Sequence, residues 1–227
     1  MGGVAYGAAE VEQGSQGKSG WAKRCAMAMI IDVGRSSDCE VKSSVATVFL
    51  DRDGVINRKM PEGEYVRSWL DFEMLPGVAE AIGRLNRAGK SVFVVSNQRG
   101  VALGYYTNED VDAIHNALQR TLNANGAHVD RFYFCPHDRG QCACRKPLTG
   151  LFEQARAEFP QVEPRTSVMI GDSLSDVEFG QRAGMRTLFL AGAAETRRAG
   201  AEEAARLADS SCASLAEAVD ILLQDEK

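Results

Sequence analysis

From residue 45 onward the chain alternates short apolar runs with longer segments of helical periodicity, and this alternation limits the fold more than any other feature. Short runs of mostly apolar residues are typical of strands that are buried on both faces of a sheet. They occur at 45–50 (VATVFL), 91–95 (SVFVV), 129–134 (VDRFYF), 167–170 (SVMI) and 186–190 (RTLFL). We therefore predict an α/β fold, a Rossmann-like three-layer α/β/α sandwich with a mainly parallel sheet.

Helical patterns fill the intervals between these strands. One begins near Pro76, which suits the first turn of a helix, and ends at about Ala88, just before a glycine. Another follows Thr107, a favourable N-cap residue, and stops near Gly126. The apolar face of this second helix is formed by Val111, Ile114, Leu118 and Leu122. Further helices are predicted near 148–159, 174–183 and 214–224, with a last short strand near 209–213.

Residues 1–44 differ from the rest of the chain, because they are rich in Gly, Ser and Ala and show no sustained period. We therefore predict a flexible N-terminal extension at 1–44 and one globular domain at 45–227. No run of about eighteen apolar residues occurs, so we expect no transmembrane helix. The lack of a signal-peptide pattern favours a cytoplasmic location.

The net charge of -5 argues against binding to nucleic acid or to anionic membranes. Proteins that bind these polyanions usually present a net basic face that displaces counterions. We expect a monomer whose partner is a small soluble molecule, with neither nucleic acid nor membrane involved.

Polar side chains follow the predicted strands at the point where each strand ends. Asp51 and Asp53 follow the first strand, Ser96 and Asn97 follow the second, and Cys135 and Asp172 follow the next two. In open parallel sheets, ligands bind beyond the carboxyl ends of the strands. The sequence therefore predicts a single site at this edge of the sheet.

The side chains expected at this edge suit phosphoryl transfer. Asp51 and Asp53 are two residues apart, so in extended backbone they point to one side. The carboxylates of Asp172 and Asp176, in the segment GDSLSD, suit a hard divalent cation such as Mg²⁺. A hydroxyl from Ser96 and a positive charge from Lys146 complete the set of groups that such a reaction needs.

A second metal site is predicted in the segment FCPHDRGQCACRKP at 134–147. Three cysteines and one histidine form a Cys3His set, which is a common complement for structural zinc. These ligands are Cys135, His137, Cys142 and Cys144. A disulfide or spare thiols are the alternatives, and the expected reducing compartment disfavours the disulfide. His115 and His128 lack such neighbours and are predicted to be surface or cap residues.

Four motifs, DRDG, SNQ, the lysine of RKP, and GDSLSD, occur in the order found in the haloacid dehalogenase superfamily of aspartate-nucleophile phosphatases, which the chain resembles over about residues 45–224. The segments FLDRDGVIN, SNQRGVALG, CPH and CACRKP resemble more narrowly the capless subfamily III, which contains D-glycero-D-manno-heptose 1,7-bisphosphate phosphatases and histidinol phosphatases. The resemblance makes residues 45–227 a phosphatase domain with a zinc-bound loop. No large cap insert is apparent at 57–76 or 100–107.

The resemblance also implies a mechanism. Asp51 would attack phosphorus and form an aspartyl-phosphate, and Asp53 would serve as acid and then as base. Ser96 and Lys146 would bind the phosphoryl oxygens. Magnesium would be held by Asp51, the carbonyl of Asp53 and Asp172, with Asp176 in its outer shell. The zinc loop would be structural and would present Arg145 and Lys146 to the substrate.

The substrate expected from this resemblance is a small phosphorylated sugar, with D-glycero-D-manno-heptose 1,7-bisphosphate favoured and its 7-phosphate removed. Seven residues are predicted to bind it: Glu62, Tyr65, Asn97, Gln98, Arg99, Arg145 and Lys146. Histidinol phosphate is the alternative substrate, because the loop between His137 and Cys142 is shorter than in many heptose enzymes. A third hypothesis is a zinc-stabilised interaction module without catalysis, although the retained aspartates argue against it.

Overall fold

The computed structural model describes residues 44–192 and 200–225, and its centre is a parallel sheet. The strands lie in the order β3-β2-β1-β4-β5-β6, and every pairing between them is parallel. Their bounds are β1 (Thr47–Leu50), β2 (Ser91–Asn97), β3 (Arg131–Cys135), β4 (Ser167–Gly171), β5 (Arg186–Leu190) and β6 (Ser210–Cys212). The predicted parallel α/β fold is confirmed. The division at residue 44 stays a prediction, because 1–43 lie outside the described residues.

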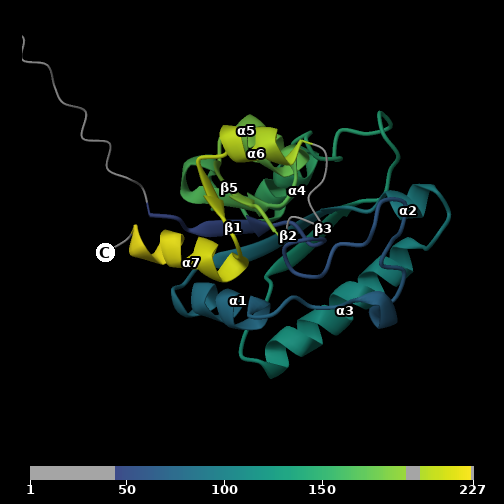
Figure 1. Cartoon of the computed structure of the whole chain (residues 1–227), viewed down its shortest axis with the longest axis horizontal. Coiled ribbons are helices and arrows are strands. Elements are labelled where there is room, and N and C mark those ends of the chain that lie inside the picture. Colours follow the sequence, from purple (N-terminus) through teal and green to yellow (C-terminus); the bar gives the residue numbers. More distant parts are fainter. Residues whose placement is uncertain (1–43, 193–199, 226–227) are drawn as a thin grey trace, which may run out of the picture. The chain divides into compact units, whose positions relative to one another are not determined.

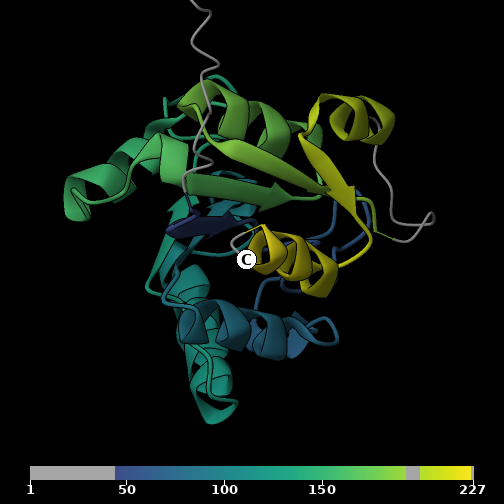
Figure 2. The same ribbon diagram turned by 90° about the vertical axis from the view of Figure 1, so that its left-hand side faces the viewer.

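Helices cover both faces of this sheet and form the outer layers of the sandwich (Figures 1 and 2). One face carries α1 (Val78–Arg87), α3 (Asn108–Ala124) and α7 (Leu215–Gln224). The other carries α4 (Gly150–Glu158), α5 (Leu174–Ala183) and α6 (Ala201–Leu207). The short helix α2 (Arg99–Ala102) and two 3-10 turns, η1 (Trp69–Asp71) and η2 (Pro164–Thr166), complete the described elements. Neither α2 nor α6 was predicted from the sequence.

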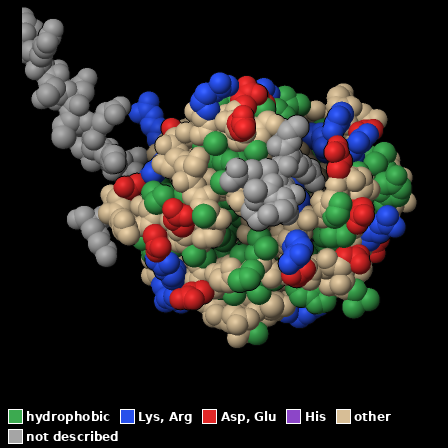
Figure 3. All heavy atoms as spheres, viewed as in Figure 1, with side chains coloured by type: hydrophobic (Ala, Val, Ile, Leu, Met, Phe, Trp, Pro, Cys, Tyr) green, Lys and Arg blue, Asp and Glu red, His purple; other side chains and the backbone are tan. Residues whose placement is uncertain are grey.

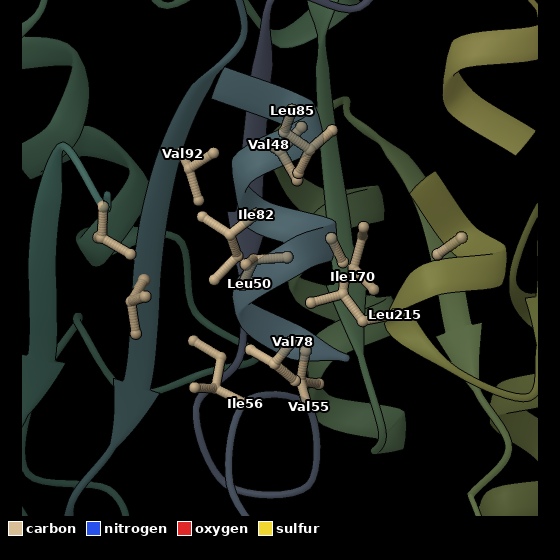
Figure 4. Close-up of a cluster of buried hydrophobic side chains, with 14 of the residues drawn as sticks. Val48, Leu50, Val55, Ile56, Val78, Ile82, Leu85, Val92, Ile170 and Leu215 are labelled. Atoms are coloured by element: carbon tan, nitrogen blue, oxygen red, sulfur yellow. The ribbon is translucent and has the colours of Figure 1, made fainter. Parts of the chain in front are cut away.

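The central strands are buried on both faces, as their apolar sequences predict. Figure 4 shows Val48 and Leu50 of β1 beside Ile82 and Leu85 of α1. Phe49, which lies between the two β1 residues, belongs instead to the cluster on the opposite face of the sheet. Alternate residues of one strand therefore serve two separate cores. This double burial anchors the strand that carries the first polar side chains of the site.

The local signals in and around α3 are confirmed except at one histidine. Thr107 is the N-cap, and its hydroxyl oxygen accepts a hydrogen bond from the backbone of Asp110 at 3.2 Å. The prediction that His115 lies at the surface or in a cap is wrong, because its side chain is buried and stacks on Phe132 with ring centroids 4.6 Å apart. Burial lowers the pKa of His115 to about 3. His128 is at the surface, as predicted.

The segments that join β1 to α1 and β2 to α3 run over the carboxyl edge of the sheet. Within the described chain, neither 57–76 nor 100–107 contains an inserted domain. Among the described helices, none is long and apolar enough to cross a membrane. The face drawn in Figure 3 intersperses basic, acidic and hydrophobic side chains.

Candidate active site

The carboxyl ends of three neighbouring strands bring the predicted polar side chains together. Asp51 follows β1, Ser96 and Asn97 end β2, and Asp172 follows β4. Because β1 lies between β2 and β4, these residues lie at one edge of the sheet, where Asp51, Ser96 and Asn97 line a pocket of about 680 Å³. All predicted catalytic and substrate-binding residues line it: Asp51, Asp53, Glu62, Tyr65, Ser96, Asn97, Gln98, Arg99, Arg145 and Lys146. Their positions agree with the sequence analysis, and their roles stay predictions.

Lys146 is a buried cation of the pocket. Its Nζ lies 2.9 Å from Oδ1 of Asp51 and 2.6 Å from Oδ1 of Asp176, and it donates to the carbonyl oxygen of Val95 at 2.7 Å. Burial lowers the pKa of this ammonium, but the two carboxylates more than offset that effect and hold the pKa above its usual value. Lys146 therefore carries a permanent positive charge beside Asp51.

Asp51 is the carboxylate that burial perturbs most clearly. Burial raises its pKa to about 7, Lys146 opposes this rise, and the carboxylates of Asp176, Asp172 and Asp53 reinforce it. Like charges this close cannot all ionise at little cost unless a cation joins them. The electrostatics of the pocket thus favour a further positive ion next to Asp51.

The residues present fit a magnesium ion. Oxygen atoms of Asp51, Asp172 and Asp176 lie within 4.8 Å of one another, and carboxylate oxygens are the ligands that Mg²⁺ prefers. Gly54 makes room for this group, because a Cβ added at its φ of +105° would stand 2.1 Å from Oδ2 of Asp172. The ammonium of Lys59, which was not predicted as a site residue, contacts the same carboxylate. Coordination through the carbonyl of Asp53 stays a prediction.

A hydrogen-bonded network surrounds the carboxylate of Asp53. The guanidinium of Arg52 donates to both of its oxygens at 2.9 to 3.3 Å, and the amides of Asn57 and Gln98 each donate at 2.9 Å. Burial alone raises the pKa of Asp53, but the charge of Arg52 and these hydrogen bonds lower it overall. Arg52 is only 1% exposed. Asp53 is therefore held as a carboxylate in this state.

Two of the residues predicted to bind substrate also hold the site together. The side-chain amide of Asn97 donates to the carbonyl oxygen of Lys146 at 3.1 Å and accepts from its backbone nitrogen at 3.0 Å. Gln98 is 2% exposed, and its amide nitrogen donates to Ser96 Oγ at 2.6 Å. Asn97 thus links β2 to the backbone of Lys146, and Gln98 links it to the carboxylate of Asp53.

The predicted Cys3His residues form a compact cluster. Cys135 Sγ lies 3.7 Å from His137 Nδ1 and 3.5 Å from Cys142 Sγ, and Cys144 Sγ lies 3.4 Å from the same two atoms. A tetrahedral zinc ion with bonds of about 2.3 Å to sulfur spaces its ligands by roughly 3.5 to 3.8 Å. The four side chains could therefore hold a metal ion without rearrangement.

The lining of the pocket also includes charged and aromatic groups. Arg99 forms an ion pair with Asp138, and its Nε lies 2.6 Å from Oδ1 of that residue. Asp138 belongs to the segment 135–144 that carries the Cys3His cluster, here called the cysteine loop. The guanidinium of Arg145 donates to the carbonyl oxygen of His137 at 3.5 Å, so that side chain is tied to the same loop. The ring of Tyr65 packs 6.0 Å from that of Tyr106. Both arginines thus lie beside the cysteine loop.

Sequence reasoning missed several residues of this site, among them Arg52, Lys59 and Tyr106. Arg52 stands between two carboxylates in the sequence, a position that gives no reason to expect full burial. Lys59 lies in a polar segment that also suits a solvated loop. Tyr106 follows another tyrosine just before a helix cap, and only the folded chain places its hydroxyl beside Gln98.

Comparisons with known proteins agree with this geometry. A family model described as HAD-hydrolase-like matches residues 143–218. The D-glycero-alpha-D-manno-heptose-1,7-bisphosphate 7-phosphatase of Mycobacterium tuberculosis is 43% identical over 169 residues, which span 74% of this chain and 86% of that relative. The corresponding beta-anomer phosphatase of Rhodopseudomonas palustris is 41% identical over 145 residues, which span 60% of this chain and 78% of that protein.

A solved structure resembles the described fold closely. The D,D-heptose 1,7-bisphosphate phosphatase from B. bronchiseptica, complexed with magnesium and phosphate, superimposes with a TM-score of 0.70 at 30% sequence identity. The match covers 80% of this chain and 99% of that one. Similarity over most of a relative's length, together with the four motifs in one pocket, assigns the family. The chain belongs to the haloacid dehalogenase-like (HAD-like) hydrolases.

Proposed function

We propose that this protein is a Mg²⁺-dependent phosphatase that removes the 7-phosphate from D-glycero-D-manno-heptose 1,7-bisphosphate through an aspartyl-phosphate on Asp51. The observation that carries the proposal is the placement of Asp51 at the end of the central strand. There it lies 2.9 Å from the Lys146 ammonium and within 4.8 Å of two further carboxylates in an open pocket. These are the groups that an aspartate nucleophile and its phosphoryl group require.

The reaction proceeds in two displacements. A carboxylate oxygen of Asp51 attacks phosphorus, and the bond from phosphorus to the sugar oxygen breaks with its electron pair on that oxygen. Asp53 supplies the proton that the leaving oxygen needs. Water then attacks the phosphorus of the aspartyl-phosphate, Asp53 takes the water's proton, and the Asp51 carboxylate leaves. Ser96 and Lys146 bind the phosphoryl oxygens in both steps.

Asp51 and Asp172 would hold magnesium, which would supply positive charge that balances the phosphoryl oxygens. The network around Asp53 has its own effect on the two proton transfers. The pKa of Asp53 is lowered in the site without substrate, so its carboxylate takes up the proton for the first step only when the negative phosphoryl group is bound nearby and opposes that shift. The same network favours the carboxylate that the second step needs.

Two observations support the heptose substrate. The relatives compared above are named as heptose-1,7-bisphosphate 7-phosphatases, at 41% and 43% identity. Arg99 and Arg145 line the pocket, where they suit a second phosphate at the far end of a bisphosphate. Histidinol phosphate offers no second phosphate for these cations. A monomeric state and a cytoplasmic location stay predictions from the sequence.

The metal of the Cys3His cluster is proposed to be zinc with a structural role. Four protein ligands fill a tetrahedral zinc ion and leave no position for water or substrate. Since Arg145 and Lys146 follow Cys144 directly, a metal that orders the cluster also limits where these two cations can lie. The cluster thus contributes to substrate binding without touching the reacting atoms.

The experiment that tests the proposed function measures phosphate release by the purified full chain with Mg²⁺. The two anomers of heptose 1,7-bisphosphate and histidinol phosphate are compared side by side. We expect a heptose anomer to be the best substrate and Asp51→Asn to abolish turnover, because an amide cannot act as the nucleophile. Asp112→Asn, an exposed change on α3, is the matched control and should keep full activity. Turnover that survives in folded Asp51→Asn would rule out the mechanism.

A further inference from the structure

We propose that Tyr106 is a positioning residue that sets the direction of the hydrogen bonds made by Ser96 and Asp53 through the side-chain amide of Gln98. Tyr106 belongs to none of the four motifs and reaches the reacting groups only through its neighbour. The inference rests on the proposed function, because it concerns groups that act in phosphoryl transfer.

The chain of contacts is continuous and buried. The Tyr106 hydroxyl donates to Gln98 Oε1 at 2.8 Å, and Arg52 Nη2 donates to the same oxygen at 3.1 Å. At the other end of the amide, Gln98 Nε2 donates to Ser96 Oγ at 2.6 Å and to Asp53 Oδ2 at 2.9 Å. The exposed fractions of Tyr106, Gln98 and Ser96 are 6%, 2% and 1%. Water is therefore a poor substitute for any of these bonds.

The donors around Gln98 permit only one orientation of its amide. An amide oxygen accepts hydrogen bonds, and an amide nitrogen donates two. Rotating the amide of Gln98 by half a turn would place its oxygen against the Asp53 carboxylate and its NH2 group against two donors. Tyr106 and Arg52 therefore act together to keep both amide hydrogens directed at Ser96 and Asp53.

This orientation determines what Ser96 can do for a substrate. Because Ser96 Oγ accepts from Gln98, its own hydroxyl hydrogen is available to donate to another group. Ser96 lines the pocket beside Asp51 and Lys146, where a phosphoryl oxygen is the expected acceptor. The direction of donation thus runs from Tyr106 to Gln98, from Gln98 to Ser96, and from Ser96 to the phosphoryl group. The second amide hydrogen of Gln98 helps to hold the Asp53 carboxylate.

Tyr106 is well suited to remain a donor. Burial raises the pKa of its hydroxyl to about 12, so the proton stays in place throughout the neutral range. Its ring is also closely confined, since a Cβ added at Gly100 would stand 2.1 Å from Tyr106 Cε1. A glycine in α2 therefore lets the backbone lie against the ring and hold the hydroxyl toward Gln98.

The test uses the full-length chain with Tyr106→Phe, Gln98→Glu and the double variant. Tyr105→Phe makes the same chemical change at the adjacent, half-exposed tyrosine and is the control. For each protein we would measure kcat and KM, the inhibition constant of inorganic phosphate with Mg²⁺, and the melting temperature. Phosphate affinity reports on the Ser96 contact without requiring turnover.

We expect Tyr106→Phe to lower kcat and weaken phosphate inhibition by about 3- to 10-fold each, the range for one lost hydrogen bond. Gln98→Glu should cost roughly 100-fold, because it replaces the donor to Ser96 and sets a charge against Asp53. In the Gln98→Glu background, the loss of the Tyr106 hydroxyl should change either quantity by less than about twofold. Tyr105→Phe should match the wild type.

Two results would overturn the inference. One is an unchanged kcat and phosphate inhibition constant in Tyr106→Phe. The other is a full, additive loss from Tyr106→Phe in the Gln98→Glu background, which would mean that the hydroxyl acts independently of Gln98. A wild-type enzyme that hydrolyses no phosphomonoester would contradict the proposed function instead. Direct phosphate binding, measured by calorimetry with Mg²⁺, would then still decide the role of Tyr106.

Discussion

Lys146 and Asp176 form an ion pair in which the ammonium lies 2.6 Å from a carboxylate oxygen, and the two side chains are only 2% and 0% exposed. Lys146 comes from the loop before α4, and Asp176 lies in the first turn of α5, where it also accepts from the Ser173 backbone at 3.1 Å. Buried charges are tolerated when they neutralise one another. The pair therefore joins the cation that is proposed to bind the phosphoryl group to the carboxylates of the proposed magnesium site.

Lys146→Met should destabilise the metal-free protein by about 3 to 5 kcal/mol, because it leaves two buried carboxylates without their cation. Mg²⁺ should restore more of the free energy of unfolding in this variant than in the wild type, since the ion would replace the missing charge. Urea unfolding with EDTA and with excess Mg²⁺ measures both effects. Adding Asp176→Asn should recover part of the lost stability in EDTA. Equal stabilisation of variant and wild type by Mg²⁺ would contradict this account.

Gly54→Ala should weaken Mg²⁺ binding by at least roughly tenfold, because the new methyl group would displace the Asp172 carboxylate. Gly89→Ala is a matched control, since Gly89 also has a positive φ of +73° but no atom within 4 Å of an added Cβ. Both variants should lose stability from backbone strain. Only Gly54→Ala should bind Mg²⁺ more weakly in a calorimetric titration. Comparable Mg²⁺ affinity in the two variants would rule out the steric argument.

Cys142→Ser should release the metal of the Cys3His cluster and raise KM more than it lowers kcat. The reason is that Lys146 has a second support, because the Asn97 amide holds its backbone through two hydrogen bonds. Arg145 lacks that support and contacts the loop through the His137 carbonyl. Metal analysis should find one zinc ion per wild-type chain and none in the variant. A variant that loses zinc with unchanged KM would separate the cluster from substrate binding.

Acid should destabilise the fold through His115. Its pKa falls from 6.5 to about 3 on burial, so below pH 6.5 the unfolded chain binds a proton that the folded chain excludes. The contribution of neutral, buried His115 to the free energy of unfolding is complete above pH 6.5 and is lost as the pH falls toward about 3. Between about pH 6.5 and 5 the loss should be roughly 2 kcal/mol.

The comparison for this pH effect is His115→Phe, which keeps a ring against Phe132. Urea unfolding of both proteins at several pH values between 7.5 and 5 would measure the difference. The variant should lose less stability than the wild type over that interval, because it has no imidazole to protonate. Parallel curves for the two proteins would show that other groups control acid unfolding.

Much of the fold could be predicted because the signals for its strands and helices lie in residues that are close together in the sequence. The apolar runs identified the central strands, and the polar residues after them placed Asp51, Ser96 and Asp172 at one edge. His115 could have been found as well, since it is four residues after Val111 and three before Leu118, on the apolar face of α3. The two missed helices, α2 and α6, are short, and only α6 has the Ala and Glu content of a strong helix former.

The support around the catalytic groups could not be predicted from the sequence. The contact of Arg52 with Gln98 joins residues 46 positions apart, and that of Asn97 with Lys146 joins residues 49 apart. Neither pair shares a helix face or a strand pairing, so no local pattern reports it. Such contacts follow from the way three loops meet above the sheet, which depends on the packing of the whole domain.

The order of strands in the sheet also has a consequence for the protein during its synthesis. Asp51 leaves the ribosome early, and its partner Lys146 follows 95 residues later. Asp172 likewise follows 113 residues after its own partner, Lys59. A nascent chain that ends before β4 lacks one neighbour of the central strand and two of the three carboxylates of the predicted magnesium site, Asp172 and Asp176. Domains of this size generally complete their folding as units. Stalled or truncated translation products should therefore be unable to hydrolyse cellular phosphate esters, however much of the first half has formed.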